Sequence, residues 1–443
     1  MSAKIRSYPG TRDFYPTEMG FRNYMFEVQR RICHRYGYGE YQAPIIESTD
    51  LYRSKSSEEI VNEQLYTFTD RGNREVSIRP EMTPTLARMA VDRPQTEVMP
   101  LRWFSIANFM RYERPGRGRL REFYQLNVDL LGAGGATADA EILMIAIDLM
   151  KEYGASNDMF VVRVSDRRLL DLWLGIDDVE KLRRIGRLID KKEKITEEVF
   201  NSELAKECED AALESKVKSF LALHNQSLDQ DLNQLISTLN LTTDQQTELI
   251  AVFQNLKQVR SLLSKVGADS SVLFDPSIVR GFDYYTGLVF EIYDTNPENR
   301  RAIFGGGRYD RLLAQFSGKK DEIQAIGFGM GDVTLEHFLE GHNLKKAQSA
   351  GPKAYLALLD STLMADVQQL AFELRSHNIS IEVSLEATKK FGKQIELAQK
   401  KGYRYLLILG EDELKQGTVI LKDLETGAQN QIERNLVAKS LLD

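Results

Sequence analysis

Two strand-like runs joined by an arginine-rich loop limit the possible folds of this chain more than any other segment. The runs span residues 101–109 and 122–131, and the loop between them also contains two glycines and a proline. Two runs that follow each other across such a loop predict an antiparallel strand pair. Because arginine guanidinium groups bind phosphate oxygens in a bidentate way, a loop of this composition is suited to a triphosphate.

A second stretch, residues 278–291, has the composition of a ligand site next to a strand. Its later half is apolar and β-prone, while its earlier half holds Arg280 directly before one glycine, and Tyr284 and Tyr285 between that glycine and a second one. A strand would hold the arginine as a fixed cation, and the tyrosines offer flat apolar faces with a polar tip. The alternative is a hairpin whose tyrosines only fill a core.

Length and composition describe a globular protein with several domains. A chain of 443 residues exceeds what one core usually supports, so two or three domains are expected. Cys33 and Cys208 are far apart and form no metal-ligand spacing, which predicts a reducing compartment without disulfides or structural zinc. We expect no signal peptide and no membrane span, so the sequence predicts a cytoplasmic protein.

The net charge of −7 disfavours binding to nucleic acid through overall electrostatic attraction. Local basic tracts at residues 111–121 and 389–401 could still contact phosphates, because salt screens the repulsion from distant acidic groups. The alternative for each tract is a solvated surface.

Three segments together resemble the histidyl-tRNA synthetases, a family of class II aminoacyl-tRNA synthetases. Residues 278–291 and the glycine-rich residues 305–310 are similar to the two histidine-specific boxes of that family, and residues 111–129 are similar to its motif 2. Residues 18–47 are similar to motif 1, which implies a homodimer. The resemblance covers nearly the whole chain in the right order.

The resemblance implies a role for each cation of the motif 2 loop. Arg111 would contact the α-phosphate of ATP and the substrate carboxylate, Glu113 the adenine, and Arg119 and Arg121 the outer phosphates. Arg280 would stabilise the charge that develops at the α-phosphate. Beyond positioning, the reaction needs charge stabilisation by arginines and Mg²⁺, and no metal site made by the protein is expected.

A second set of residues is implied to bind histidine. Gln125 and Asp129 are four apart on one strand, so they share a face, where an amide and a carboxylate can contact the two imidazole nitrogens. The α-amino group would be received by the loop Glu81, Met82 and Thr83, although a helix N-terminal charge is the commoner role for such a carboxylate. The remaining expected contacts are Arg111, Arg280, Tyr284, Tyr285 and Tyr309.

The segment that is similar to motif 3 departs from the family pattern. Where many class II enzymes have Gly-Leu-Glu-Arg, this chain has Gly331, Asp332, Val333 and Thr334, so the arginine that grips ATP is absent. Either Arg308 or Arg119 replaces it, or nucleotide binding is weakened. For this reason Arg308 is included among the expected ATP contacts.

The expected fold is α/β, in four parts. Residues 1–165 and 267–341 form an α+β catalytic domain with a mostly antiparallel sheet of the class II synthetase type. Residues 166–266 form a helical insertion, which is either a tRNA-contacting domain or an inert decoration. Residues 352–443 alternate strands and helices, which predicts an anticodon-binding domain with a mixed, mainly parallel sheet.

These features predict a ligase that makes histidyl-adenylate from histidine and ATP and then charges the 3′ end of tRNA(His). The alternative is a synthetase-like subunit that senses histidine and regulates another enzyme, supported only by the altered motif 3. A sister synthetase for another amino acid would lack the boxes around Tyr284 and Tyr309.

Overall fold

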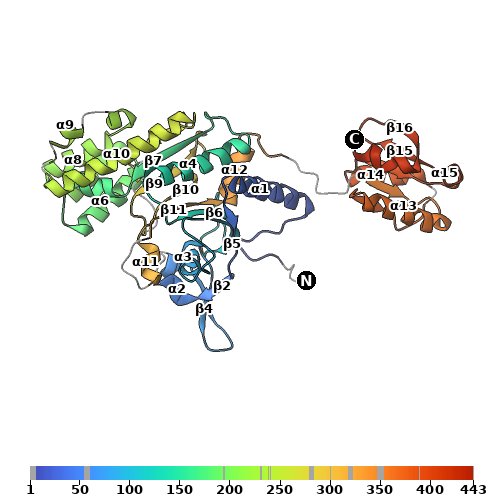
Figure 1. The fold of residues 1–443 in the computed structure, drawn as a ribbon, viewed down its shortest axis with the longest axis horizontal. Helices are drawn as coiled ribbons and strands as arrows, with labels where there is room; N and C mark the ends of the chain where they lie inside the picture. The colour runs from blue at the N-terminus through green and yellow to red at the C-terminus, as the bar shows by residue number, and fades with distance from the viewer. Residues whose placement is uncertain are drawn as a thin grey trace. The chain divides into compact units, whose positions relative to one another are not determined.

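A computed structural model describes residues 6–442, apart from residues 54–59, 193–194, 230–231, 238, 240, 279–283, 300, 318–322, 347–353 and 389. The chain forms two compact units (Figure 1). The first unit comprises residues 1–13 and 25–345, and the second comprises residues 14–24 and 346–443.

The first unit is built on a sheet that has eight strands among the described residues, in the order β1-β5-β6-β11-β10-β9-β7-β8. Neighbouring strands are antiparallel, except that β1–β5 and β7–β8 are parallel, which confirms the mostly antiparallel sheet. The strands are β1 (Gly39–Glu40), β5 (Leu101–Met110), β6 (Glu122–Leu131), β7 (Phe160–Asp166), β8 (Val272–Phe274), β9 (Leu288–Asp294), β10 (Ala302–Arg308) and β11 (Ala325–Gly331).

The hairpin of β5 and β6 occupies the position that the sequence predicts. The strands pair over ten residues each, from Leu101 opposite Leu131 to Met110 opposite Glu122. The last part of β6 is buried because helix α4 (Gly135–Glu152) packs on β6 and β11, and α10 (Thr243–Lys265) packs on α4. The first part of β6 is only partly buried, and it is this part that borders the cavities described below.

Within the segment that is similar to motif 1, the sequence predicts a strand at residues 41–47 after a helix at residues 18–36. The predicted strand is wrong in its extent. Strand β1 ends at Glu40, and the next strand, β2 (Ile46–Ser48), belongs to a separate sheet of order β2-β4-β3 with β3 (Tyr66–Thr69) and β4 (Glu75–Ile78). Pro44 lies between the two strands, and because proline has no N–H it cannot donate to either ladder. The first unit also contains α2 (Thr49–Arg53), η1 (Ile60–Gln64), α3 (Thr83–Val91), α11 (Leu312–Ser317), α12 (Asp332–Gly341) and the later part of α1 (Pro16–Arg35).

Helices fill the described part of the segment between β7 and β8. They are α5 (Arg168–Leu174), α6 (Val179–Lys191), α7 (Glu197–Cys208), α8 (Ala211–Leu221), η3 (Asn225–Asp229), α9 (Leu232–Ser237) and α10. Figure 1 shows α6, α8, α9 and α10 gathered at the β7 side of the large sheet. Trp173 is buried between Phe220 and Phe253, so this group of helices has a core of its own.

The second unit contains a five-stranded sheet of order β13-β12-β14-β15-β16. Its first two pairings are parallel and its last two are antiparallel, so the sheet is mixed as expected, but parallel pairings do not predominate. The strands are β12 (Ala354–Ala357), β13 (Ile381–Val383), β14 (Tyr405–Ile408), β15 (Thr418–Asp423) and β16 (Gln429–Glu433). The helices are η4 (Ser361–Leu363), α13 (Met364–Ser376), α14 (Phe391–Lys400), α15 (Glu411–Gln416), η5 (Arg434–Leu436) and α16 (Val437–Leu442).

Alternation along β12 divides the interior of this unit into two cores. Ala354 and Leu356 pack with α13 and α16, while Tyr355 and Ala357 pack with α14 on the other face. The sequence patterns missed β16, because its residues are polar and mostly exposed and therefore carry no strand periodicity. Within the described residues, no helix combines the length and the apolar character that crossing a membrane requires.

Candidate functional site

Three neighbouring cavities lie along β6, β10 and β11. The inner cavity has a volume of about 50 Å³ and is lined by Asp129, Tyr309 and their neighbours. The middle cavity, of about 200 Å³, is lined by Arg111, Arg119 and others, and the outer cavity is about 290 Å³. The inner and middle cavities share Gln125 and Gly329, while the middle and outer cavities share Gly118, Ile303 and Thr334.

Glycines on β11 make room for the polar side chains of β6. A Cβ atom at Gly327 would lie 2.2 Å from Oδ1 of Asp129, and one at Gly329 would lie 2.7 Å from Nε2 of Gln125. Both distances are shorter than real carbon contacts, so any larger residue would displace Asp129 or Gln125. The glycine spacing noted in the sequence therefore serves the inner cavity.

Asp129 is a buried carboxyl group of the inner cavity. It is 4% exposed, and its Oδ1 accepts a hydrogen bond from the hydroxyl of Tyr309 at 2.5 Å. Burial raises the pKa of Asp129 from 3.8 to about 7, while the hydrogen bond from Tyr309 opposes the rise. A carboxyl group whose pKa is strongly raised by burial is more frequent at functional sites than elsewhere.

Glu81 and Tyr284 form the other polar side of the inner cavity. Glu81 is 2% exposed, and its Oε2 accepts a hydrogen bond from the hydroxyl of Tyr284 at 3.2 Å. Burial and the nearby carboxylate of Glu81 raise the pKa of Tyr284 well above its ordinary value. Thr83 and Tyr285 also line this cavity, whereas Met82 is buried against Ala107 and Phe109 and does not.

Arg111 and Arg119 bring positive charge to the middle cavity. The guanidinium of Arg111 lies 5.2 Å from the ring centre of Phe123, and its Nε donates to the carbonyl of Pro80 at 2.9 Å. Arg119 forms an ion pair with Glu113 at 3.2 Å. The side chains of Arg111, Glu113, Arg119 and Phe123 all come from the loop and strand of one hairpin, and the hydrogen bond to the carbonyl of Pro80 joins this hairpin to the residue before Glu81.

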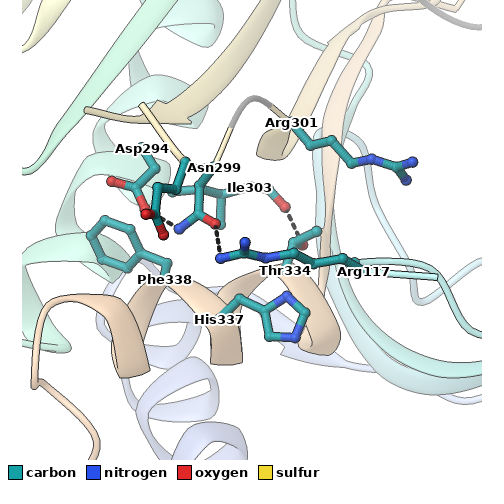
Figure 2. A pocket seen from close by; sticks show the side chains of 10 residues that line it. Arg117, Asp294, Asn299, Arg301, Ile303, Thr334, His337 and Phe338 are labelled. Atoms are coloured by element: carbon teal, nitrogen blue, oxygen red, sulfur yellow. Dashed lines mark hydrogen bonds between the residues drawn. The ribbon is translucent and has the colours of Figure 1, made fainter. Parts of the chain in front are cut away.

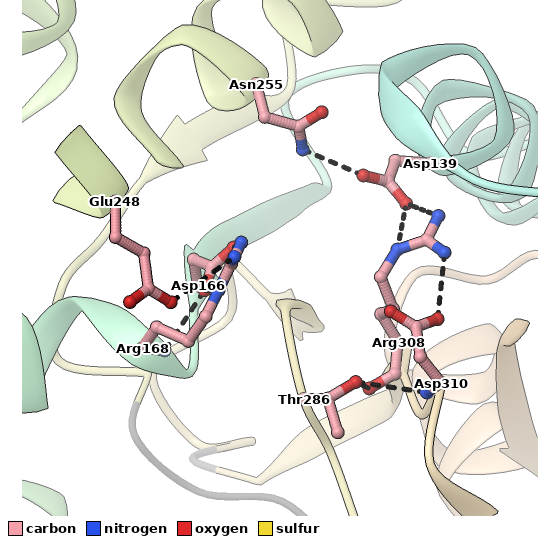
Figure 3. Close-up of polar contacts among 8 residues, drawn as sticks. All are labelled: Asp139, Asp166, Arg168, Glu248, Asn255, Thr286, Arg308 and Asp310. Atoms are coloured by element: carbon pink, nitrogen blue, oxygen red, sulfur yellow. Dashed lines mark hydrogen bonds and ion pairs between the residues drawn. The ribbon is translucent and has the colours of Figure 1, made fainter. Parts of the chain in front are cut away.

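Arg121 and Arg308 line none of the three cavities. Arg121 packs on the ring of Tyr112, with 4.2 Å between guanidinium and ring centre, and donates to the carbonyl of Glu113. Arg308 is buried between Asp139 and Asp310, with its Nε 3.0 Å from Asp139 and its Nη1 3.1 Å from Asp310 (Figure 3). Its guanidinium is occupied inside the fold, so the geometry does not favour the predicted ATP contact.

The segment that replaces motif 3 has a structural role of its own. Asp332, 3% exposed, accepts from Arg12 at 2.5 Å and from the backbone N–H of Tyr124 at 3.0 Å. Burial raises the pKa of Asp332, and Arg12 opposes the rise. The hydroxyl of Thr334 donates to the carbonyl of Ile303 at 2.6 Å, which leaves an uncharged wall between the middle and outer cavities.

Figure 2 shows the outer cavity, which the sequence did not indicate. Asn299 accepts from Arg117 at 3.1 Å and donates to Asp294 at 2.7 Å, and Asp294 also contacts Nε2 of His342 at 2.7 Å.

Phe123, Asn127 and Arg12 also escaped the sequence interpretation, and only Phe123 has a local signal, because it directly follows the arginine-rich loop on the strand that carries Gln125.

Residues 279–283 lie outside the described residues, so Arg280, the arginine predicted to act on the α-phosphate, has no described position. Within the described residues, no group of three or more His, Cys, Asp or Glu side chains could hold a metal ion.

Comparisons with known proteins agree over nearly the whole chain. Residues 10–333 match the family model "Histidyl-tRNA synthetase", and residues 353–443 match the model "Anticodon binding domain". A histidine–tRNA ligase from Leptospira biflexa is 44% identical over 96% of this chain and 94% of its own length.

Two solved structures share the fold. The crystal structure of histidyl-tRNA synthetase from Nostoc sp. PCC 7120 has a TM-score of 0.85 and 22% identity, and covers 100% of this chain and 99% of its own. An ATP phosphoribosyltransferase regulatory subunit/histidyl-tRNA synthetase from Bacillus halodurans C has a TM-score of 0.75 and 21% identity, over 92% of this chain and 99% of its own.

Proposed function

The chain belongs to the histidyl-tRNA synthetase family, and from that premise we propose how its residues carry out histidine–tRNA ligation. As a histidine–tRNA ligase it joins histidine to ATP to give histidyl-adenylate and pyrophosphate, and then transfers histidine to tRNA. The observation that supports our residue assignment is the junction of the inner and middle cavities at Gln125 and Gly329. An amino acid in one cavity and a nucleotide in the other would meet there.

The inner cavity is the proposed histidine site. Asp129 and Gln125 would contact the two imidazole nitrogens, with Asp129 accepting from the N–H. Glu81, with Thr83 beside it, would receive the α-ammonium group, because a buried carboxylate favours a cationic partner. Tyr284, Tyr285 and Tyr309 would close the cavity around the ring and exclude water.

The middle cavity is the proposed site of ATP, which carries Mg²⁺ with it as part of the substrate. The adenine would stack on Phe123, Glu113 would contact its exocyclic amine, and Arg111 would lie beside the α-phosphate. The histidine carboxylate attacks the α-phosphorus, the new C–O–P linkage forms, and the bond from this phosphorus to the bridging oxygen breaks. Pyrophosphate leaves with that oxygen.

No protein nucleophile is needed in this reaction, so the protein acts by positioning and by charge stabilisation. Arg280 keeps its proposed role at the α-phosphate from its place in the first histidine-specific box. Arg121 and Arg308 are left out of the proposed ATP site, because one packs on Tyr112 and the other is paired with Asp139.

The remaining proposals concern the parts of the chain and its partners. We assign adenylation to residues 1–165 and 267–341, a contact with the acceptor arm of tRNA(His) to residues 166–266, and anticodon binding to residues 352–443. We also propose a homodimer, based on the resemblance of residues 18–47 to motif 1, and a cytoplasmic location, based on the reducing compartment that the two free cysteines indicate. Sizing of the purified protein in solution tests the dimer.

One experiment tests the substrate and separates the ligase from a histidine sensor. ATP–pyrophosphate exchange is measured with each amino acid, and charging of tRNA(His) is measured with histidine. We expect exchange with histidine alone, followed by charging. Histidine binding without exchange would instead support a regulatory subunit.

A further inference from the structure

We propose that Arg301, at the junction of the middle and outer cavities, binds the outer phosphates of ATP. This arginine would supply the charge that Thr334 cannot. The inference rests on the proposed function, because it assumes that ATP occupies the middle cavity.

The direction of the reaction places the outer phosphates at this junction. Attack on the α-phosphorus is in line, so the attacking carboxylate and the leaving pyrophosphate lie on opposite sides of it. The carboxylate would come from the inner cavity, through the opening at Gln125 and Gly329. The pyrophosphate would therefore point away from the inner cavity, toward the opening at Gly118, Ile303 and Thr334.

Arg301 borders that opening. It lines the outer cavity, while the next two residues of the chain, Ala302 and Ile303, line the middle cavity. Its Cδ atom lies 3.7 Å from the position that a Cβ atom would take at Gly118. In Figure 2 the side chain extends past Thr334 and away from Asp294 and Asn299.

Arg301 is also the cation at this junction whose guanidinium is available. It is exposed, and it makes no hydrogen bond or ion pair with any residue that the structure describes. Other arginines nearby are held by side chains: Arg117 donates to Asn299, and Arg119 pairs with Glu113. A planar guanidinium with two parallel donors suits phosphate oxygens, and its long side chain can reach from the rim of the cavity.

The test compares ATP with AMP, which lacks the outer phosphates. Equilibrium binding of each nucleotide to the full-length protein is measured by calorimetry for the parent, for Arg301→Gln and for Arg187→Gln. Arg187 is an exposed arginine on α6 and serves as the matched control for the loss of one positive charge. We expect Arg301→Gln to weaken ATP binding roughly 10- to 100-fold, the range for one charge-assisted contact, and to leave AMP binding unchanged.

Two results would overturn the proposal. One is unchanged ATP binding by Arg301→Gln, and the other is an equal loss for ATP and AMP, which would assign the arginine to the adenosine part or to the fold. Failure of the proposed function is a separate result, because it appears in the parent protein as the absence of histidine-dependent ATP–pyrophosphate exchange.

Discussion

Replacing Asp129 with asparagine should stabilise the unliganded protein at alkaline pH while it weakens histidine binding. Asparagine keeps an oxygen that can accept from Tyr309, so the hydrogen bond at 2.5 Å has an acceptor in the variant. It removes the buried charge, which is the reason that the pKa of Asp129 stands at about 7 rather than 3.8. The substitution therefore separates the structural role of this carboxyl from its role in the site.

The sign and the size of the effect follow from proton linkage. Because the folded-state pKa of Asp129 is above the unfolded value, its contribution to stability is complete below about pH 4 and is lost as the pH rises through about 7. The side chain is almost fully buried, so no discount for solvent screening applies. At roughly 1.4 kcal/mol per pH unit, the charged carboxyl costs about 4 kcal/mol above pH 7, and asparagine avoids that cost.

The assay is thermal unfolding of the full-length protein between about pH 5 and pH 8.5, without ligand and with saturating histidine. The melting temperature of Asp129→Asn should exceed that of the parent by a few degrees at the alkaline end, and the difference should shrink toward pH 5. Histidine should stabilise the parent much more than the variant, because the site loses an acceptor for the imidazole N–H. Asp177→Asn, at an exposed position before α6, is the matched control for the loss of one carboxylate that is not buried.

The reasoning is refuted if the variant is less stable than the parent at pH 8, or if the difference is the same at every pH. Either result would mean that ionisation of the buried Asp129 carboxyl does not destabilise the folded protein.

Three further predictions address other parts of the molecule. Arg280→Ala should lower ATP–pyrophosphate exchange by about a hundredfold or more with little change in circular dichroism, since one preorganised donor contributes roughly 3–4 kcal/mol to the transition state; near-normal exchange with intact histidine binding would contradict its assignment. Arg12→Ala leaves the buried carboxylate of Asp332 without the guanidinium that lies 2.5 Å away. The free energy of unfolding, measured in urea, should therefore fall by roughly 3 kcal/mol. A decrease below about 1 kcal/mol would mean that this ion pair is not important for stability. Truncation after residue 345 should keep ATP–pyrophosphate exchange but sharply reduce charging of tRNA, because a second tethered contact to the same RNA is lost. Circular dichroism and sizing serve as controls, because residues 14–24 belong to the same compact unit as residues 346–443. A folded truncated protein that charges tRNA at the full rate would argue against an anticodon-binding role.

The sequence by itself determined the elements whose periodicity is local. The hairpin of β5 and β6 has the bounds that the two apolar runs predict to within one residue, and the second unit alternates strands and helices as expected, because burial follows the period of each element. Gln125 and Asp129 share one cavity because residues four apart on a strand face the same side. The resemblance of this hairpin to motif 2 then predicts that it takes part in the adenylation reaction.

Only the tertiary structure decided which charged groups are free for a ligand. Arg308 and Arg301 are equally charged in the sequence, yet Asp139, 169 residues away, holds Arg308 inside the fold while Arg301 stays at the rim of a cavity. Asp332 in the altered motif 3 is occupied by Arg12, 320 residues away. Such pairings depend on which distant segments the fold brings side by side, and local hydrophobic periodicity carries no information about that.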